Sequence, residues 1–512
     1  MTSVDPETPF NPRSGEQRAG EPGSSPRIPD VTALARWMRT WVGDEGQIRG
    51  FHNHSVWGTN PFTFLDFTSG HQAFSAPATA AFGEALGRRF DERGLELWRR
   101  MMRFQARTVQ PDGQYRHIGF QVGESATSGL IHNMVGSIGL LEGLRHAGLL
   151  LSDDERGEVL AAVRANLDAC TIYGGGRPGP DGTCNQEYAR VWVKLLYTEL
   201  SGDVTYADQI LDDLDTLIEL HHVRGVPDSD SAGTFRVAAD RERGGILEPA
   251  EYYGLMIVPL VLAARRYDRP DLLEEARAIC RHVVRSAWTD DRGETRYHRY
   301  WYLEGDRALL STTPMLIAGM GLTLRGIAEV LRDGDDDAEL SDFVERCLAT
   351  YASYQAPAGY FASATGWHNE ADVSPSTAWH SHDLMFLTDW LPIDESFWDR
   401  VFEPSERQSV MLSDRAYWVE DDRHWCILSP LTAGDLSIYG RKDRDTFGRS
   451  FFTWTDKEQL LDELAYPDAP VFFAADDGLY RVDHPTRAVD VTTIGSVPYR
   501  GSIASSPSAD RT

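Results

Sequence analysis

A cluster of amide, carboxyl and phenol groups opens a segment of helical periodicity near residues 186–201. In the stretch GTCNQEYARVWV the first turn holds Asn185, Gln186, Glu187 and Tyr188. Surface helices usually begin with a small capping residue followed by acidic residues, so this first turn needs another explanation. Such groups can bind a polar substrate and transfer protons to it. This turn is therefore the first candidate site.

Three further segments of helical periodicity begin with similar groups, and each follows a long connection. Segments that follow short turns begin instead with acidic runs such as SDDERGEV and RPDLLEEA, which favour the helix dipole and contact with water. The unusual starts therefore predict helices whose first turns face a shared polar space. Their first turns hold His132 and Asn133; Glu251, Tyr252 and Tyr253; and Ser376, His380 and Asp383.

Apolar residues at intervals of three and four predict helices throughout the middle of the chain. Short turns join several of these helices into hairpins, and longer connections separate the hairpins. Helix pairs of this kind can form an (α/α) toroid, in which outer helices enclose a ring of inner helices. We expect about five to six hairpins. The predicted helices lie near 77–107, 129–147, 152–173, 186–201, 204–222, 250–267, 269–287, 314–332, 336–355 and 376–391.

The inner helices of such a toroid run parallel, so their N-terminal ends open at one mouth together with the long loops. We expect the helices that follow long connections to be the inner ones. The helix near 129–147 carries Gly136, Gly139 and Gly143, a stripe of small residues suited to close packing between inner helices. On this arrangement the first turn at 185–188 points into a common cavity.

Beyond Pro404 the pattern changes to short alternating segments such as RAYWVED, HWCILSP and PVFFAAD, separated by turns rich in Gly and Asp. This change predicts a small antiparallel β domain. Both ends of the chain are rich in Pro, Ser, Gly and charged residues, which is typical of disorder. The predicted units are a tail at 1–29, a helical toroid at 30–403, a β-rich domain at 404–490 and a second tail at 491–512.

Taken together, these features resemble the α/α-toroid carbohydrate-active enzymes, which comprise polysaccharide lyases and related glycoside hydrolases. The resemblance covers roughly residues 30–480 and rests on the repeated helix pairs, their long loops and the appended strands. It is a resemblance to the class, not to one of its families. It implies an oligosaccharide or polysaccharide substrate. The same architecture also hosts epimerases and protein-modifying enzymes, so the site residues must support the functional argument.

The long connections are rich in aromatic residues and carry one alternating basic run. Aromatic faces stack on sugar rings while their polar edges bond hydroxyl groups, which predicts contacts from Trp301 and Trp367. In the run TRYHRYWY, an extended backbone would place Arg296, His298 and Tyr300 on one face. A guanidinium group binds a carboxylate through its planar fork, and a uronic acid supplies such a carboxylate.

These groups predict β-elimination on a uronate-containing glycan. The C5 proton of a uronate becomes removable once the adjacent carboxylate is neutralised, because the enolate-like intermediate is then stabilised. A Tyr or His can remove that proton, and a Tyr or His can protonate the leaving oxygen. We predict catalytic roles for Tyr188, Tyr252, His298, His132 and Glu187. We predict substrate binding by Asn133, Gln186, Arg296, Tyr300, Trp301, Trp367 and Glu251.

Three alternatives to elimination stay open. Uronate epimerisation begins with the same proton abstraction. A glycan-binding protein could keep the toroid without catalysis. Glycoside hydrolysis needs two carboxyl groups about 5–5.5 Å or about 6.5–9.5 Å apart, depending on the stereochemical outcome. The candidate carboxyl groups are Glu124, Glu187, Glu251, Asp306, Glu370 and Asp383.

The charge of the chain narrows the classes of partner. A formal net charge of −28 disfavours binding to nucleic acid and to anionic membranes, because no large basic surface offsets it. No apolar run reaches the roughly 20 residues that span a bilayer, and the first 30 residues lack the apolar core of a signal peptide. The sequence therefore predicts a cytoplasmic protein without a membrane partner.

Metal and cofactor chemistry has weak support in the sequence. The five cysteines are scattered, with no CxxC spacing. His368, His380, His382 and Asp383 gather in one region, but on a helix His380 and Asp383 share a face while His382 points away. We predict no cofactor and no metal site, although a divalent cation could serve to neutralise substrate charge.

Overall fold

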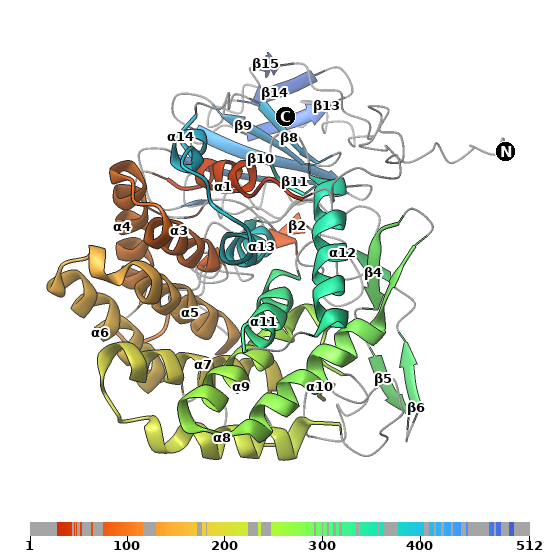
Figure 1. Ribbon diagram of the computed structural model, residues 1–512. Helices are drawn as coiled ribbons and strands as arrows, with labels where there is room; N and C mark the ends of the chain where they lie inside the picture. Colours follow the sequence, from red (N-terminus) through yellow and green to blue (C-terminus); the bar gives the residue numbers. More distant parts are fainter. Residues whose placement is uncertain are drawn as a thin grey trace, which may run out of the picture.

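The computed structural model (Figure 1) provides the description of the fold. The predicted tails fall outside the described residues, apart from 28–29 and 491–495. The described residues are 28–43, 46, 48, 52–53, 63–64, 75–109, 111–115, 130–170, 177–180, 182–223, 234–236, 247–290, 293–298, 301–304, 307–310, 314–316, 320–333, 337–355, 359–361, 377–403, 409–413, 416–420, 424–431, 434–441, 447–448, 471–475, 478–482 and 491–495.

Six described helices form a closed inner ring. Each packs against the next in chain order, and the last packs against the first (Figure 1). Their apolar residues form one continuous core. The ring therefore confirms the predicted toroidal arrangement. Its members are α3 (Pro77–Arg88), α5 (Leu130–Ala147), α7 (Cys184–Ser201), α9 (Gly254–Tyr267), α11 (Gly321–Leu331) and α13 (Thr377–Trp390).

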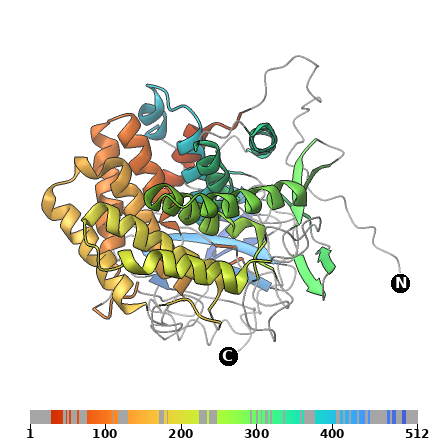
Figure 2. The ribbon, with the colours of Figure 1, turned by 60° about the horizontal axis from the view of Figure 1, so that its bottom comes forward.

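A second layer of helices surrounds this ring (Figure 1), and Figure 2 shows the same helices turned by 60°. The helices that follow short turns all lie in this layer, as their acidic first turns predict. Local caps start several of them: Ser152 and Glu155 form a capping box, and the Asp91 and Asp337 side chains accept hydrogen bonds from first-turn amides. The outer helices are α1 (Val31–Thr40), α4 (Glu92–Arg107), α6 (Asp153–Ala169), α8 (Ala207–His221), α10 (Pro270–Ser286) and α12 (Ala338–Tyr354).

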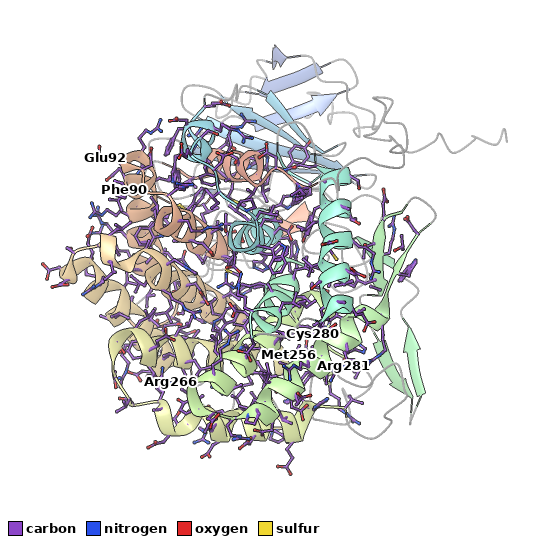
Figure 3. All side chains as sticks on the ribbon, viewed as in Figure 1. Phe90, Glu92, Met256, Arg266, Cys280 and Arg281 are labelled. Atoms are coloured by element: carbon purple, nitrogen blue, oxygen red, sulfur yellow. The ribbon has the colours of Figure 1, made fainter. Side chains whose placement is uncertain are left out.

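Glycines allow the inner helices to approach closely. A methyl group on Gly139 would lie 2.4 Å from the Ala76 carbonyl oxygen, so this glycine of the predicted stripe allows α5 to pack closely against the start of α3, whereas Gly136 lies against Tyr115. A methyl group on Gly254 would lie 1.8 Å from the Leu322 carbonyl oxygen. Farther along α9, the Met256 Sδ lies 3.7 Å from the Cys184 Sγ on α7 (Figure 3). Outside the core, Phe90 is exposed at the turn between α3 and α4.

Two predicted helices differ from those observed. The segment 77–107 divides into α3 and α4, because Asp91 caps a new helix by accepting hydrogen bonds from the backbone N–H groups of Arg93 and Gly94 at 2.9 and 3.0 Å. The segment 314–332 becomes helical only from Gly321. Its first residues instead form strand β7 (Pro314–Leu316), because they pair with a neighbouring strand.

The described part of the long connection between α10 and α11 contains five short strands, β3 to β7. β3 (Ala287–Thr289), β4 (Thr295–His298) and β7 form an antiparallel sheet, and β5 (Trp301–Glu304) pairs with β6 (Arg307–Leu310). β4 packs beside α10 and α12, which are outer helices. A two-residue pair, β1 (His52–Asn53) and β2 (Thr63–Phe64), lies earlier in the chain.

The chain beyond residue 404 forms antiparallel strands, as the alternating pattern predicts. Neighbouring strands β8 to β12 form a five-stranded meander, and β13 to β15 form a three-stranded sheet. Whether these strands fold as a separate domain stays a prediction. Their bounds are β8 Ser409–Ser413, β9 Ala416–Glu420, β10 His424–Leu431, β11 Gly434–Arg441, β12 Phe447–Gly448, β13 Val471–Ala475, β14 Gly478–Val482 and β15 Val491–Gly495.

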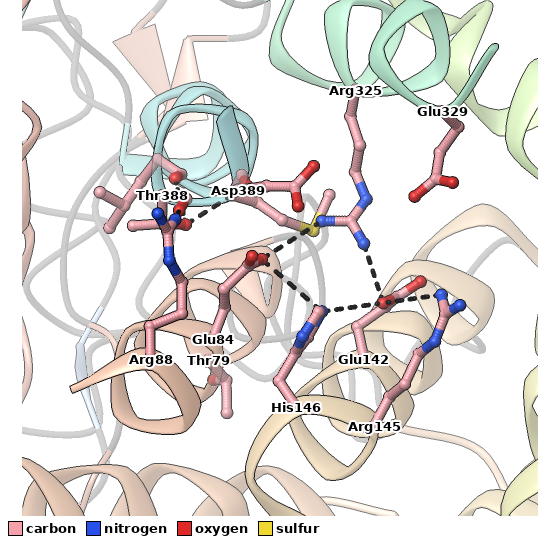
Figure 4. A network of polar contacts seen from close by, with 12 residues as sticks. Thr79, Glu84, Arg88, Glu142, Arg145, His146, Arg325, Glu329, Thr388 and Asp389 are labelled. Carbon is pink, nitrogen blue, oxygen red and sulfur yellow. Dashed lines mark hydrogen bonds and ion pairs between the residues drawn. The ribbon is translucent and has the colours of Figure 1, made fainter. Parts of the chain in front are cut away.

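A buried ionic network joins four inner helices (Figure 4). The fully buried Arg325 of α11 places its Nη2 2.9 Å from Glu142 Oε2 on α5 and its Nη1 3.9 Å from Glu84 Oε2 on α3. His146 Nε2 lies 3.5 Å from the Glu142 carboxylate and 3.6 Å from that of Glu84. Trp192 of α7 donates its ring N–H to Glu142 Oε1 at 3.1 Å. The network therefore connects opposite sides of the ring.

The acids of this network have opposite protonation preferences. Burial alone would raise the pKa of Glu142, but Arg325, His146 and a neighbouring arginine hold that pKa well below its usual range. Burial and the negative charge of Asp389 on α13 raise the pKa of Glu84 to about 7. The pKa of Asp389 is lowered, because arginines and a hydrogen bond with Glu84 outweigh its burial. Glu84 therefore carries the proton of this carboxyl pair.

Replacing Arg325 with Met should strongly destabilise the protein. The change removes the closest cation of the buried Glu142 and leaves it, among the described residues, only Arg145, at 3.8 Å, and His146. Breaking a buried ion pair typically costs about 3–5 kcal/mol. Chemical denaturation measures the free energy of unfolding. The control is Arg269→Met, which removes a solvent-exposed ion pair with Asp215 and should cost below about 1 kcal/mol. Equal losses in the two variants would contradict a special role for the buried network.

Replacing Glu84 with Gln should change how stability depends on pH. Because the pKa of Glu84 is higher in the folded state, protonation of Glu84 stabilises the folded protein. This stabilisation is complete below pH 4.5 and is lost as the pH rises to about 7. Gln stays uncharged at every pH. The stability of Glu84→Gln relative to wild type should therefore rise by roughly 1–3 kcal/mol between pH 4.5 and 7.5 and then level off. Thermal unfolding across this range provides the measurement, and a constant difference would refute the expectation.

Candidate functional site

The first turns of three inner helices meet at the mouth of the ring. The ring of Tyr252, in the short helix η3 (Ala250–Tyr252) that precedes α9, lies 5.8 Å from the ring of Trp379 on α13. Ile131 of α5 packs against the same tryptophan, and both Ile131 and Tyr252 also pack against the main core. The N-terminal ends of these helices contact one another here, and Glu84 and Asp389, near the C-terminal ends of α3 and α13, meet in the ionic network. The inner helices therefore run parallel.

The predicted site residues at this mouth differ in their access to solvent. Tyr252, His132 and Gln186 are half-buried. Glu187, Tyr188 and Glu251 are 0% exposed. Among the predicted residues at the helix starts, a phenol, an imidazole and an amide side chain are therefore only half-buried, whereas the carboxyl groups are buried.

Glu187 faces an outer helix and not the mouth. Its carboxylate pairs with Arg190 one turn along α7. Lys194 continues this stripe and places its Nζ 2.6 Å from Asp213 Oδ2 on α8. Burial is the main cause that raises the pKa of Glu187 to about 7, and Arg190 opposes the shift. Glu187 is therefore part of a buried charge cluster between α7 and α8.

The other residues of the α7 first turn also have structural partners. Tyr188 contacts Phe235 edge-on, with ring centroids 5.5 Å apart. Asn185 donates its backbone N–H and its side-chain Nδ2 to the two carboxylate oxygens of Glu248, each at 2.9 Å. The Gln186 Oε1 is inaccessible to solvent and accepts no hydrogen bond from the described part of the chain. The Glu187 Oε1 shares this property, so what distinguishes Gln186 within this turn is that its side chain is half-buried and not fully buried.

Asn133 lies in a buried hydrogen-bond cluster between α5 and α6. Its Oδ1 accepts the Tyr115 backbone N–H at 3.0 Å and the Asn166 Nδ2 at 2.8 Å. Ser137 donates to Asn166 Oδ1 at 2.8 Å and completes the cluster. These bonds hold the start of α5, which carries His132 to the mouth.

The start of α13 divides its polar residues between two faces, as helical spacing predicts. His380 Nε2 accepts the Phe361 backbone N–H at 2.9 Å, and Asp383 Oδ1 accepts the Tyr351 hydroxyl at 2.6 Å and the Gly321 backbone N–H at 3.1 Å. His382 lies on the other face, with its ring edge-on to Trp379 at 5.5 Å. His382 is therefore a buried neighbour of Trp379, and the other two residues hold neighbouring elements.

Arg296 is placed away from the mouth. On β4 beside the outer helices, its Nε lies 2.9 Å from Asp290 Oδ2 and its Nη2 3.5 Å from Glu294 Oε2. It forms local ion pairs there. The side chains of His298 and Trp301, and the residues Tyr300 and Trp367, lie outside the described residues, so their predicted roles stay predictions.

Sequence reasoning missed Trp379 and Glu248, and it considered His382 only as a possible metal ligand. Trp379 and His382 are three residues apart, so their shared helical face was visible in the spacing, but nothing in the spacing says that this face meets Tyr252. Glu248 lies in a loop, 63 residues from its partner Asn185. Only the folded chain shows that contact.

The described ranges give no independent sign of a metal or of a membrane segment. They contain no group of three or more His, Cys, Asp or Glu side chains arranged to hold a metal ion. None of the helices in the same ranges has the length and apolar character to cross a membrane.

Comparison with known proteins identifies structural neighbours only. No protein-family model and no curated protein sequence matches the chain. A family 76 glycoside hydrolase from a bovine Bacteroides thetaiotaomicron strain is 14% identical, with a TM-score of 0.50 over 70% of this chain and 78% of its own. That likeness shows a shared fold, the α/α toroid of carbohydrate-active enzymes.

Two further neighbours have lower scores. An unsaturated glucuronyl hydrolase from Bacillus sp. GL1 is 16% identical, with a TM-score of 0.48 over 70% of this chain and 94% of its own. A polysaccharide lyase is 11% identical, with a TM-score of 0.47 over 73% of this chain and 99% of its own.

Replacing Glu187 with Gln should leave turnover within about fivefold of wild type, because its carboxyl group faces α8 and not the mouth. Initial rates on a glycan that the wild type cleaves provide the measurement. Circular dichroism of the variant serves as the control for folding. A folded Glu187→Gln variant without turnover would show that this carboxyl group acts in catalysis.

Proposed function

We propose that the protein is a carbohydrate-active enzyme that cleaves a uronate-containing glycan by β-elimination at the mouth of the toroid. One observation carries the proposal: Tyr252, His132 and Gln186, at the starts of inner helices, are only half-buried, whereas Glu187 and Glu251 are fully buried. Elimination needs groups that transfer a proton and a group that binds the substrate carboxylate. The accessible residues are of these types.

The accessible groups have distinct roles in this reaction. The Gln186 amide donates a hydrogen bond to the uronate carboxylate and stabilises the enolate-like intermediate. Tyr252 or His132 removes the C5 proton, and the other protonates the glycosidic oxygen as the C4–O bond breaks. The electron pair of the C5–H bond forms a C4=C5 double bond. The products are an unsaturated uronate and a shortened glycan.

The aromatic cluster supports binding of a sugar ring. Tyr252 lies half-exposed against the buried Trp379, with an interplanar angle of 32°, so one face of its ring is held by packing. A supported aromatic side chain binds a pyranose with little loss of conformational entropy. A glycan is therefore the substrate class that this surface supports best.

Glycoside hydrolysis is the alternative, and the position of Glu251 favours it. This carboxyl group directly precedes Tyr252 at the mouth, so a modest movement of η3 would bring it to a substrate. Hydrolysis requires a second carboxyl group at a suitable distance. The nearby described acids have other partners: Glu248 binds Asn185, and Asp383 binds Tyr351. Elimination therefore remains the better-supported reaction.

The two reactions leave different products, and Tyr252→Phe tests the proposed one. Uronate polymers should yield a product that absorbs ultraviolet light, and the variant should lose about 10²–10⁴-fold in turnover because it lacks the hydroxyl group. Tyr188→Phe is the matched control, since Tyr188 is buried against Phe235, and its turnover should fall by less than about tenfold.

The outcome that rejects elimination is release of saturated reducing sugars without the ultraviolet signal. In that case Glu251→Gln should abolish turnover while Tyr252→Phe does not. Binding of glycan without any cleavage would instead indicate a non-catalytic protein.

A further inference from the structure

A single buried carboxylate connects two parts of the proposed site. Glu248 is 0% exposed, and its two oxygens accept hydrogen bonds from the backbone N–H and the Nδ2 of Asn185, each at 2.9 Å. Thr183, the N-cap residue of α7, makes no capping hydrogen bond with its side chain. A carboxylate from a distant loop therefore takes the place of the usual cap, where the helix dipole favours negative charge.

The segment that carries Glu248 also carries Tyr252. Its backbone is held on both sides: the Glu248 N–H donates to the Phe235 carbonyl at 2.8 Å, and the Tyr252 N–H donates to the Pro249 carbonyl at 3.0 Å. One residue later, the Tyr253 hydroxyl lies 2.6 Å from Thr234 Oγ1. The segment is thus hydrogen-bonded to residues 234 and 235 at both of its ends, and Glu248 is the part of it that binds α7.

On the α7 side, the residue next to Asn185 is Gln186. The two hydrogen bonds of Glu248 therefore set the position of the Gln186 first turn relative to Tyr252. We propose that Glu248 is a positioning residue that holds these two groups at the spacing needed for elimination. This inference rests on the proposed function, because it assigns Gln186 and Tyr252 to one reaction.

The chemistry of the pair explains why a carboxylate is required. Asn185 presents two donors, and a carboxylate presents two acceptors in a matching fork. In Glu248→Gln an NH₂ group would face the Asn185 Nδ2, so one hydrogen bond would be replaced by a clash between donors. In Asn185→Asp two carboxylates would face each other. Combining the two changes restores one donor opposite each acceptor.

The experiment compares Glu248→Gln, Asn185→Asp and the double variant on a uronate polymer that the wild type cleaves. Each single variant should lose about 10- to 100-fold in kcat with a smaller change in KM, because the substrate still binds but the reacting groups are misplaced. The double variant should recover at least about tenfold over the weaker single variant. A double variant no better than the weaker single one would overturn the proposal.

A matched control separates positioning from general loss of a helix cap. Asp91 caps α4 at the end of the ring opposite the mouth, where its side chain accepts the Arg93 and Gly94 amides. Asp91→Ala should lower the melting temperature while leaving kcat unchanged. If Asp91→Ala lowered kcat as much as Glu248→Gln does, the effect of Glu248 would be one of stability, and the proposal would fail.

Amide hydrogen exchange separates this inference from the proposed function. The Asn185 amide should exchange at least about tenfold faster in Glu248→Ala than in wild type, because it loses its acceptor. Unchanged exchange would overturn the positioning role. If the wild type cleaved no uronate polymer, the proposed reaction would fail, whereas faster exchange in the variant would still show that Glu248 holds the start of α7.

Discussion

The buried guanidinium of Arg325 is the constraint on which the ring depends. A cation inside a helical bundle must be neutralised from several sides, and Arg325 obtains its acids from α5 and α3 across the interior. Glu142 in turn accepts a hydrogen bond from Trp192 of α7. Because these partners come from four inner helices, the network requires the closed ring, and only the closed ring brings the helix starts to one mouth.

The polar residues in the first turns of the inner helices fall into two groups, structural residues and residues at the mouth. Most of them stabilise the architecture: Asn133 joins α5 to α6, Glu187 pairs with Arg190 beside α8, and Asp383 holds Tyr351 and the start of α11. A minority reach the mouth. The structural group is large because inner helices are buried all round, so any polar side chain in their first turns needs a partner.

This division shapes the proposed chemistry. The carboxyl groups satisfy buried donors, while the accessible positions fall to Tyr252, His132 and Gln186. A mouth of this composition can transfer protons and bind a carboxylate without a pair of free acids. Glu248 contributes by joining the Tyr252 segment to the Gln186 turn.

The sequence by itself determined the toroid, its inner and outer helices and the close packing at Gly139, because these depend on helical periodicity and on whether a first turn must face water. It also indicated which turns open at the mouth. Only the tertiary structure decided that Gln186 is half-buried whereas Glu187 and Tyr188 are fully buried, and that Arg296 forms local ion pairs. Adjacent residues on one helical turn point about 100° apart, so the direction that meets a partner is set by helices distant in the chain, as the contact from Glu248 to Asn185 shows.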